Sequence, residues 1–208
     1  YGYFRSSAAY RVRIALALKG LAYESKAINL RLGDQWTPDY RQTNPQALVP
    51  ALVTEGRTLT QSLAIVEYLD ETHPEPPLLP RDAVGRSRVR SLAYDVACEI
   101  HPLNNLRVLR YLVRDMKVGD DDKNRWYRHW VETGLETVER QLDGPATGRF
   151  CHGDAPTLAD IVLVPQIFNA QRYDCRLDHV PRVMRVFDAC MALPAFEGTQ
   201  PSKCPDAE

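Results

Sequence analysis

The sequence has no apolar stretch approaching the roughly 18 residues that a membrane-spanning helix needs. Its formal net charge of -1 gives no overall reason to expect nucleic acid or an anionic membrane as a partner. The five cysteines are odd in number and form no Cys-x-x-Cys pair, which argues against a disulfide framework and a zinc site. Scattered thiols of this kind are typical of small core or surface residues in a reducing compartment, so a cytoplasmic location is predicted.

The residues that are present suffice for a folded core, since 44% of the 208 are hydrophobic. Residues 1–73 alternate strand and helix patterns, including a second strand at 25–30. Clustered prolines make 74–84 a stiff linker. Residues 85–208 are helical in pattern, with a kink or break at Pro102, a capping box at Thr157–Asp160 and a poorly ordered tail at 194–208. The predicted class is therefore an α/β domain followed by an all-α domain.

The most informative stretch runs from Tyr3 to Leu16, where a strand end, a polar turn and a helix follow one another. A helix N-terminus offers backbone N–H groups and partial positive charge to an anion. Arg11 and Arg13 lie in the first turns of this helix, where positive charge is unfavourable for the helix dipole. Their presence there is easier to explain if the turn binds an anion. A hydroxyl of Ser6 or Ser7 would stabilise a thiolate. An ordinary Ser-capped helix with solvated arginines is the alternative.

Further polar positions follow along the chain. Gln61-Ser62 is a second strand-to-helix junction, with Ser62 as the expected N-cap and simple capping as the alternative. Pro50 is out of place in a central strand, so Val49-Pro50 is expected at a strand end or bulge. His101 is either a ligand contact or a satisfied structural residue. Arg172 either serves a site or complements the C-terminal dipole of its helix.

Together these motifs resemble the cytosolic glutathione S-transferases, and within them the zeta class of maleylacetoacetate and maleylpyruvate isomerases. The specific segments are Phe4-Arg5-Ser6-Ser7 with Arg11–Leu16, Asn44-Pro45 with Val49-Pro50, Gln61–Ile65, and Leu163–Gln166. The resemblance covers nearly the whole chain. It implies a thioredoxin-like N-terminal domain, an all-helical C-terminal domain and a homodimer.

The resemblance also implies roles for individual residues. Ser6, with Ser7 beside it and Arg5 before it, would form the catalytic turn that stabilises the thiolate of bound glutathione. Other glutathione contacts would come from Gln35, Val49, Pro50, Gln61, Ser62, His101 and Asn105. The substrate, a small maleyl dicarboxylate, would be held by Arg5, Arg107 and Arg172, because guanidinium groups suit planar carboxylates. No metal is expected.

One departure from the family pattern is Ala8, because that pattern usually reads Ser-Ser-Cys-Ser and this chain reads Ser6-Ser7-Ala8-Ala9. An enzyme-borne cysteine nucleophile is excluded at this position. The implied reaction is cis–trans isomerisation by reversible addition of glutathione, which carries its own sulfur. Two alternatives stay open: a glutathione transferase that conjugates or dehalogenates small electrophiles such as α-halo acids, and a non-catalytic interaction module.

Overall fold

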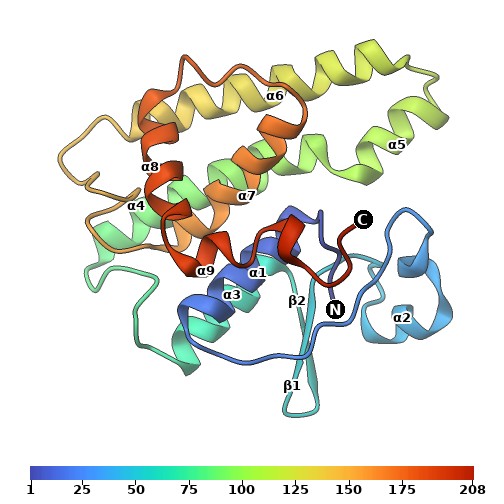
Figure 1. Cartoon of the computed structure of the whole chain (residues 1–208), viewed down its shortest axis with the longest axis horizontal. Helices are drawn as coiled ribbons and strands as arrows, with labels where there is room; N and C mark the ends of the chain where they lie inside the picture. Colours follow the sequence, from blue (N-terminus) through green and yellow to red (C-terminus); the bar gives the residue numbers. More distant parts are fainter. The chain divides into compact units, whose positions relative to one another are not determined.

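The computed structural model describes all 208 residues, and the chain divides into two compact units (Figure 1). The first unit comprises Tyr1–Leu78 together with Met191–Glu208, and the second comprises Leu79–Cys190. The division between Leu78 and Leu79 falls inside the segment predicted as a linker. None of the helices has the length and apolar character needed to cross a membrane.

The first unit is built on a small sheet. Strands β1 (Ala51–Thr54) and β2 (Arg57–Thr60) pair antiparallel, with Ala51 opposite Thr60. Tyr1 exchanges backbone hydrogen bonds with Ala51, and Gly2 bridges Ala27 in parallel on the other side. The first residues therefore lie between the segment around Ala27 and β1, as in the thioredoxin-like arrangement that the family resemblance implied.

The segment 25–30 does not form the predicted strand beyond the single bridge at Ala27. Its residues 25–27 are exposed, and the chain turns away where Asn29 accepts the amides of Arg31 and Leu32. A strand pattern without a second neighbour, in which only Ile28 is buried, gains little from pairing. Local propensity therefore favoured a strand that the surroundings do not support.

Helices α1 (Ser7–Leu18) and α3 (Ser62–Thr72) pack together, while the short α2 (Pro38–Thr43) follows a turn of 3₁₀ helix at Asp34–Trp36. The core face of α1 includes Val12, Ile14, Ala15 and Leu16, which are all buried. Lys19 ends α1 and forms an ion pair with Asp70 of α3 at 2.7 Å. The two helices are thus joined by apolar packing and by one mostly buried charge pair.

The C-terminal segment is ordered, so the prediction of a poorly ordered tail at 194–208 is wrong. Helix α9 (Pro194–Glu197) lies against α1, and the tail returns to the side of the first unit on which the chain begins (Figure 1). Phe196 is fully buried, and its carbonyl accepts a hydrogen bond from the Tyr10 hydroxyl at 2.8 Å. The buried Phe196 side chain holds the tail in place, which the polar composition of the tail did not indicate.

The second unit begins with α4 (Ala83–Tyr94), continues through a π-helical stretch (Asp95–Ile100) and a 3₁₀ turn (His101–Asn104), and reaches α5 (Leu106–Arg114). Pro102 explains the irregular stretch, because its ring cannot donate to the helix and collides with the carbonyl four residues earlier. The predicted break at Pro102 is therefore confirmed as a change of helix type.

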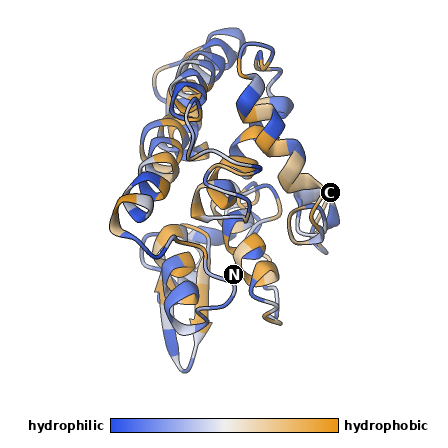
Figure 2. Cartoon of the chain, turned by 90° about the vertical axis from the view of Figure 1, so that its left-hand side faces the viewer, coloured by the Kyte–Doolittle hydropathy of each residue, from blue (hydrophilic) through white to orange (hydrophobic).

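Helices α6 (Asp120–Gln141), α7 (Leu158–Arg172) and α8 (Pro181–Met191) complete the helical part. Orange and blue segments alternate along helices in Figure 2, as expected for helices with one buried and one solvated face. Helix α7 is buried along most of its length and begins with the predicted capping box between Thr157 and Asp160. It forms the centre of the second unit.

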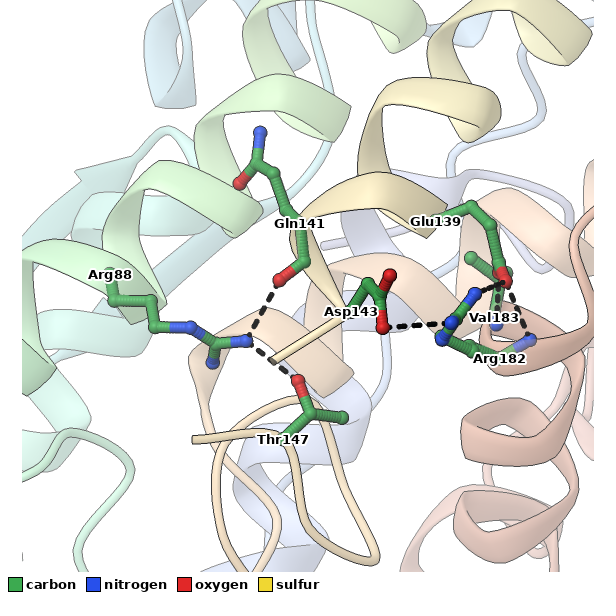
Figure 3. A network of polar contacts seen from close by, with 7 residues as sticks. All are labelled: Arg88, Glu139, Gln141, Asp143, Thr147, Arg182 and Val183. Carbon is green, nitrogen blue, oxygen red and sulfur yellow. Dashed lines mark hydrogen bonds and ion pairs between the residues drawn. The ribbon is translucent and has the colours of Figure 1, made fainter. Parts of the chain in front are cut away.

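Two charged side chains bind helix ends in the second unit (Figure 3). The guanidinium of Arg88, on α4, donates to the carbonyl oxygen of Gln141 at 3.1 Å and to the hydroxyl of Thr147 at 2.7 Å, so it caps the C-terminus of α6. The carboxylate of Glu139, on α6, accepts the backbone N–H groups of Arg182 (3.1 Å) and Val183 (2.9 Å). Helix α8 is therefore capped by a residue of another helix, in accord with its N-terminal dipole.

Gly134 of α6 makes a close contact that a larger residue would destroy. A β-carbon added there would lie 2.3 Å from Cγ1 of Ile100, in the π-helical stretch. We expect Gly134→Ala to lower the free energy of unfolding by about 1–3 kcal/mol through overpacking. Urea unfolding measures the loss. Gly144→Ala, with nothing within 4 Å, is the control. The double variant Gly134→Ala/Ile100→Ala should lose less stability than the sum of the two single variants, because truncation of Ile100 removes the clash, and a strictly additive loss would contradict the clash.

Candidate functional site

The turn before α1 presents Ser6 at the N-terminus of the helix. Ser6 N–H donates to the Tyr3 carbonyl at 2.9 Å, closing a turn, and the Ser6 hydroxyl oxygen accepts the Ala9 N–H at 3.2 Å. A hydroxyl that accepts this capping bond still has a hydrogen to donate. Ser6 is therefore both the N-cap of α1 and a donor next to the positive end of the helix dipole, which suits a bound thiolate.

Ser7 and Arg5 flank this hydroxyl in different environments. Ser7 is the first residue of α1 and is buried, whereas Arg5 is half-buried and places its guanidinium 4.7 Å from the centre of the Phe4 ring. Stacking on an aromatic ring holds the guanidinium plane while leaving its edge N–H groups for a carboxylate. Of the two serines, Ser6 has the more accessible position in the turn.

Arg11 and Arg13 do not stand at this turn as free cations, so the idea that they await an anion there is wrong. The Arg11 guanidinium is buried and donates to the hydroxyl of Ser62 at 3.3 Å. Arg13 donates to the carbonyl oxygens of Phe4 (3.1 Å) and Thr199 (3.0 Å). Burial lowers the pKa of Arg13 from its ordinary value, yet guanidinium stays charged at any physiological pH. Arg11 therefore links α1 to Ser62, and Arg13 holds the backbone at Phe4 and Thr199.

The second junction brings Ser62 to the N-terminus of α3, linked to α1 through Arg11. Ser62 is buried as the first helical residue, and the N-cap position belongs to Gln61, so the predicted Ser62 cap is wrong by one residue. Gln61 has a positive φ of 67° and donates its side-chain amide to Gln46 at 3.1 Å. This left-handed residue turns the chain sharply into α3, which the sequence did not reveal because glycine usually fills such positions.

The peptide bond between Val49 and Pro50 is cis, and Pro50 immediately precedes β1, so it lies at a strand end as predicted. The carbonyl of Leu48 accepts two side-chain donors, the hydroxyl of Tyr40 at 2.5 Å and the amide of Asn44 at 2.7 Å. Burial raises the pKa of Tyr40 to about 12, so it remains a neutral donor. Tyr40 and Asn44 therefore fix the backbone before Val49. The Asn44-Pro45 turn was the available signal for this role.

Gln35 supplies a polar atom that lacks a partner in the folded chain. It lies in the 3₁₀ turn at Asp34–Trp36, is only 4% exposed, and its amide oxygen has no hydrogen-bond donor. An unpaired buried carbonyl-type oxygen costs about 1–3 kcal/mol. A ligand that donates an N–H would remove that cost.

The first unit therefore presents four groups that suit a peptide-like thiol with an anionic end. They are the Ser6 hydroxyl, the N-terminus of α3, the backbone beside the cis Pro50, and the unpaired amide oxygen of Gln35.

In the second unit, His101, Asn105 and Arg107 lie together at the start of α5. Asn105 is the N-cap, its oxygen accepts the Arg107 N–H at 3.1 Å, and its amide nitrogen lies 3.4 Å from Nε2 of His101. Arg107 is exposed in the first turn. Capping is thus one established role for Asn105, and His101 orients its amide.

Arg172 is on a different helix of the same unit, at the end of α7. Its guanidinium carbon lies 5.0 Å from the centre of the Tyr173 ring, and that ring stacks on Tyr127 at 3.7 Å. Burial raises the pKa of Tyr127 strongly, and the nearby Arg172 charge partly offsets this shift. Arg172 is exposed, so its guanidinium stacks on the Tyr173 ring while its N–H groups face solvent.

Two family models of known proteins match this chain, one in its N-terminal part and one in its C-terminal part. Residues 1–77 match the model of the glutathione S-transferase N-terminal domain, and residues 124–194 match that of the C-terminal domain. The maleylacetoacetate isomerase of Rhizobium meliloti is 45% identical over 98% of this chain and 95% of its own length.

Two solved structures are similar over the whole chain. A bacterial maleylpyruvate isomerase, described as a zeta-class glutathione S-transferase, superposes with a TM-score of 0.98 at 43% identity and covers 100% of this chain and 99% of its own. The maleylacetoacetate isomerase of Anaeromyxobacter dehalogenans, with dicarboxyethyl glutathione and citrate bound, gives a TM-score of 0.88 at 47% identity, covering 100% and 96%. The chain therefore belongs to the glutathione S-transferase family, in the zeta class that the first of these structures represents.

Proposed function

We propose that this protein is a glutathione-dependent isomerase that converts a maleyl dicarboxylate, maleylacetoacetate or maleylpyruvate, to its fumaryl isomer. The observation that carries the proposal is the Ser6 turn, where a donor hydroxyl stands at the N-terminus of α1 with Arg5 beside it. When bound, glutathione supplies a thiolate that adds to the double bond and leaves again after rotation. Relatives bearing both isomerase names, and one with a dicarboxyethyl conjugate of glutathione bound, support this class of substrate.

Each candidate residue would have its own role in this reaction. Ser6 holds the sulfur in its ionised form by donating a hydrogen bond, with Ser7 as a buried support. Gln35, Val49, Pro50, Gln61 and Ser62 bind the peptide backbone and carboxylates of glutathione, with His101 and Asn105 as further contacts. Arg5, Arg107 and Arg172 hold the carboxylates of the substrate and the negative charge that develops beside the reacting carbon. None of these steps needs a thiol at Ala8.

We further propose that the active form is a cytoplasmic homodimer that acts in the breakdown of aromatic compounds, including aromatic amino acids. The free cysteines agree with a reducing compartment: Cys151, Cys175 and Cys190 are buried, and none of the five is in a disulfide. Burial raises the pKa of Cys175 to about 12, so this thiol does not compete as a nucleophile at neutral pH.

The proposal is tested by offering both maleyl acids side by side to the purified protein, with and without glutathione. We expect conversion to the fumaryl product only when glutathione is present, and no net loss of thiol. Activity that persists without glutathione would contradict the mechanism. An α-halo acid in a parallel reaction distinguishes a conjugating enzyme, because conjugation consumes thiol in proportion to product. Titration with glutathione separates both from a non-catalytic module, which would not bind it.

A further inference from the structure

The backbone of Phe4, the residue before the Arg5-Ser6-Ser7 turn, is held on both sides by charged side chains. Its N–H donates to the carboxylate of Asp206 at 3.0 Å, and its carbonyl oxygen accepts from the guanidinium of Arg13 at 3.1 Å. Asp206 comes from the other end of the chain. The turn therefore depends on a contact that spans almost the whole sequence.

These contacts form one connected set with the C-terminal tail. Arg13 also donates to the Thr199 carbonyl at 3.0 Å, and its charge interacts favourably with Asp206. One turn earlier on α1, the Tyr10 hydroxyl donates to the Phe196 carbonyl. We call the Asp206, Phe4, Arg13 and Thr199 contacts the tail clamp. It binds the tail to α1 and, through Phe4, to the turn.

We propose that Asp206 is a positioning residue for glutathione, because the tail clamp fixes the Phe4 peptide and hence the direction of the Ser6 hydroxyl two residues later. The inference rests on the proposed function and adds to it a residue that lies outside the Ser6 turn and the Gln61-Ser62 junction. Hydrogen bonds between a backbone N–H and a carboxylate are stronger than neutral ones. Losing one would leave the N–H of a buried residue without its acceptor.

The rest of the turn depends on this peptide. Ser6 N–H is tied to the Tyr3 carbonyl, and Ser6 also caps α1, so only the Phe4–Arg5 portion is free to change its backbone angles. The tail clamp removes that freedom. A hydroxyl held in one direction before the ligand arrives binds a thiolate more tightly than one that must be ordered on binding.

The tail offers a matched control at Glu208. Its carboxylate binds Arg31 at 2.8 Å and the Asn29 amide at 3.0 Å, on the exposed surface and away from the turn. Glu208→Ala therefore removes an equal charge and an equal tail contact while leaving Phe4 untouched. Asp206→Asn keeps the size of the side chain and one acceptor oxygen, and serves as the conservative variant.

The experiment measures hydrogen exchange of the segment containing Phe4–Ser7, glutathione binding by titration, and the pH dependence of bound-thiolate absorbance in the full-length protein. We expect Asp206→Ala to speed exchange in this segment, weaken glutathione roughly tenfold or more, as loss of one charge-assisted hydrogen bond implies, and move thiolate formation to higher pH. Asp206→Asn should lie between Asp206→Ala and wild type, and Glu208→Ala should match wild type in all three.

The proposal is overturned if Asp206→Ala and Glu208→Ala are indistinguishable in exchange and in glutathione binding. If Asp206→Ala does not fold, the same comparison between Asp206→Asn and Glu208→Gln decides. Failure of the proposed function has a different signature, because a wild-type protein without isomerase activity still reports on the tail clamp through exchange and binding.

Discussion

Replacing Ser6 by glycine should lower kcat/KM for the isomerisation by roughly 10²–10³-fold, which corresponds to about 2.7–4 kcal/mol of transition-state stabilisation. The Ser6 hydroxyl is the donor at the N-terminus of α1, and no cysteine in the turn can replace it. Glycine is the informative substitution because it retains most N-capping ability, within a few tenths of a kcal/mol. Steady-state kinetics with glutathione varied at several pH values measures the effect.

Two further variants separate catalysis from folding. Ser6→Ala removes both the hydroxyl and the cap that accepts from Ala9, so it should match the glycine variant in rate and lose about 1 kcal/mol more stability. Ser7→Ala should have the smaller effect on rate, because Ser7 is buried as the first residue of the helix. If Ser7→Ala abolishes activity while Ser6→Gly retains it, the roles of the two serines are exchanged.

Replacing Asp160 by alanine should give the largest loss of stability, about 3–5 kcal/mol. Its carboxylate is fully buried and accepts the backbone N–H groups of Cys151 and Thr157 and the Thr157 hydroxyl, each at 2.8 Å. Alanine would leave these three donors buried without an acceptor. The same residue completes the capping box of α7, so the loss would fall on the central helix of the second unit.

Urea or thermal unfolding of the full chain measures this loss. Asp154→Ala is the matched control, because Asp154 is an exposed carboxylate in the preceding loop that accepts only the Arg149 N–H at 2.9 Å. That variant should change stability by less than about 1 kcal/mol. Asp160→Asn should be intermediate, since an amide offers one acceptor oxygen in place of two. Equal losses for Asp160→Ala and Asp154→Ala would show that the buried carboxylate is unimportant.

Features with a local cause could be predicted from the sequence. The N-cap at Ser6, the capping box at Thr157 and Asp160, and the break at Pro102 all depend on residues within one or two helical turns. Ser6, Ser7, Gln61 and Ser62 were found in the same way, at strand-to-helix junctions, whereas Gln35 came from the family resemblance alone. Their specific roles came from the family resemblance and remain predictions to be tested by the variants above.

Features with a distant cause could not be predicted. The tail is ordered because Phe196 fills a site beside α1 and because Asp206 finds the Phe4 peptide, and neither partner is near in sequence. Arg11 resembled a cation awaiting a ligand, but its partner Ser62 lies 51 positions away. The strand at 25–30 failed for the same reason, since pairing depends on neighbours that a local pattern does not contain.

The placement of Met191–Glu208 with the first unit has a consequence for biosynthesis. A unit that includes residues 191–208 cannot finish folding before these residues have been synthesised, although its first 78 residues emerge early. The helical unit, continuous from Leu79 to Cys190, has no such delay. The surface of the first unit that Phe196 covers therefore stays exposed until Phe196 has been synthesised.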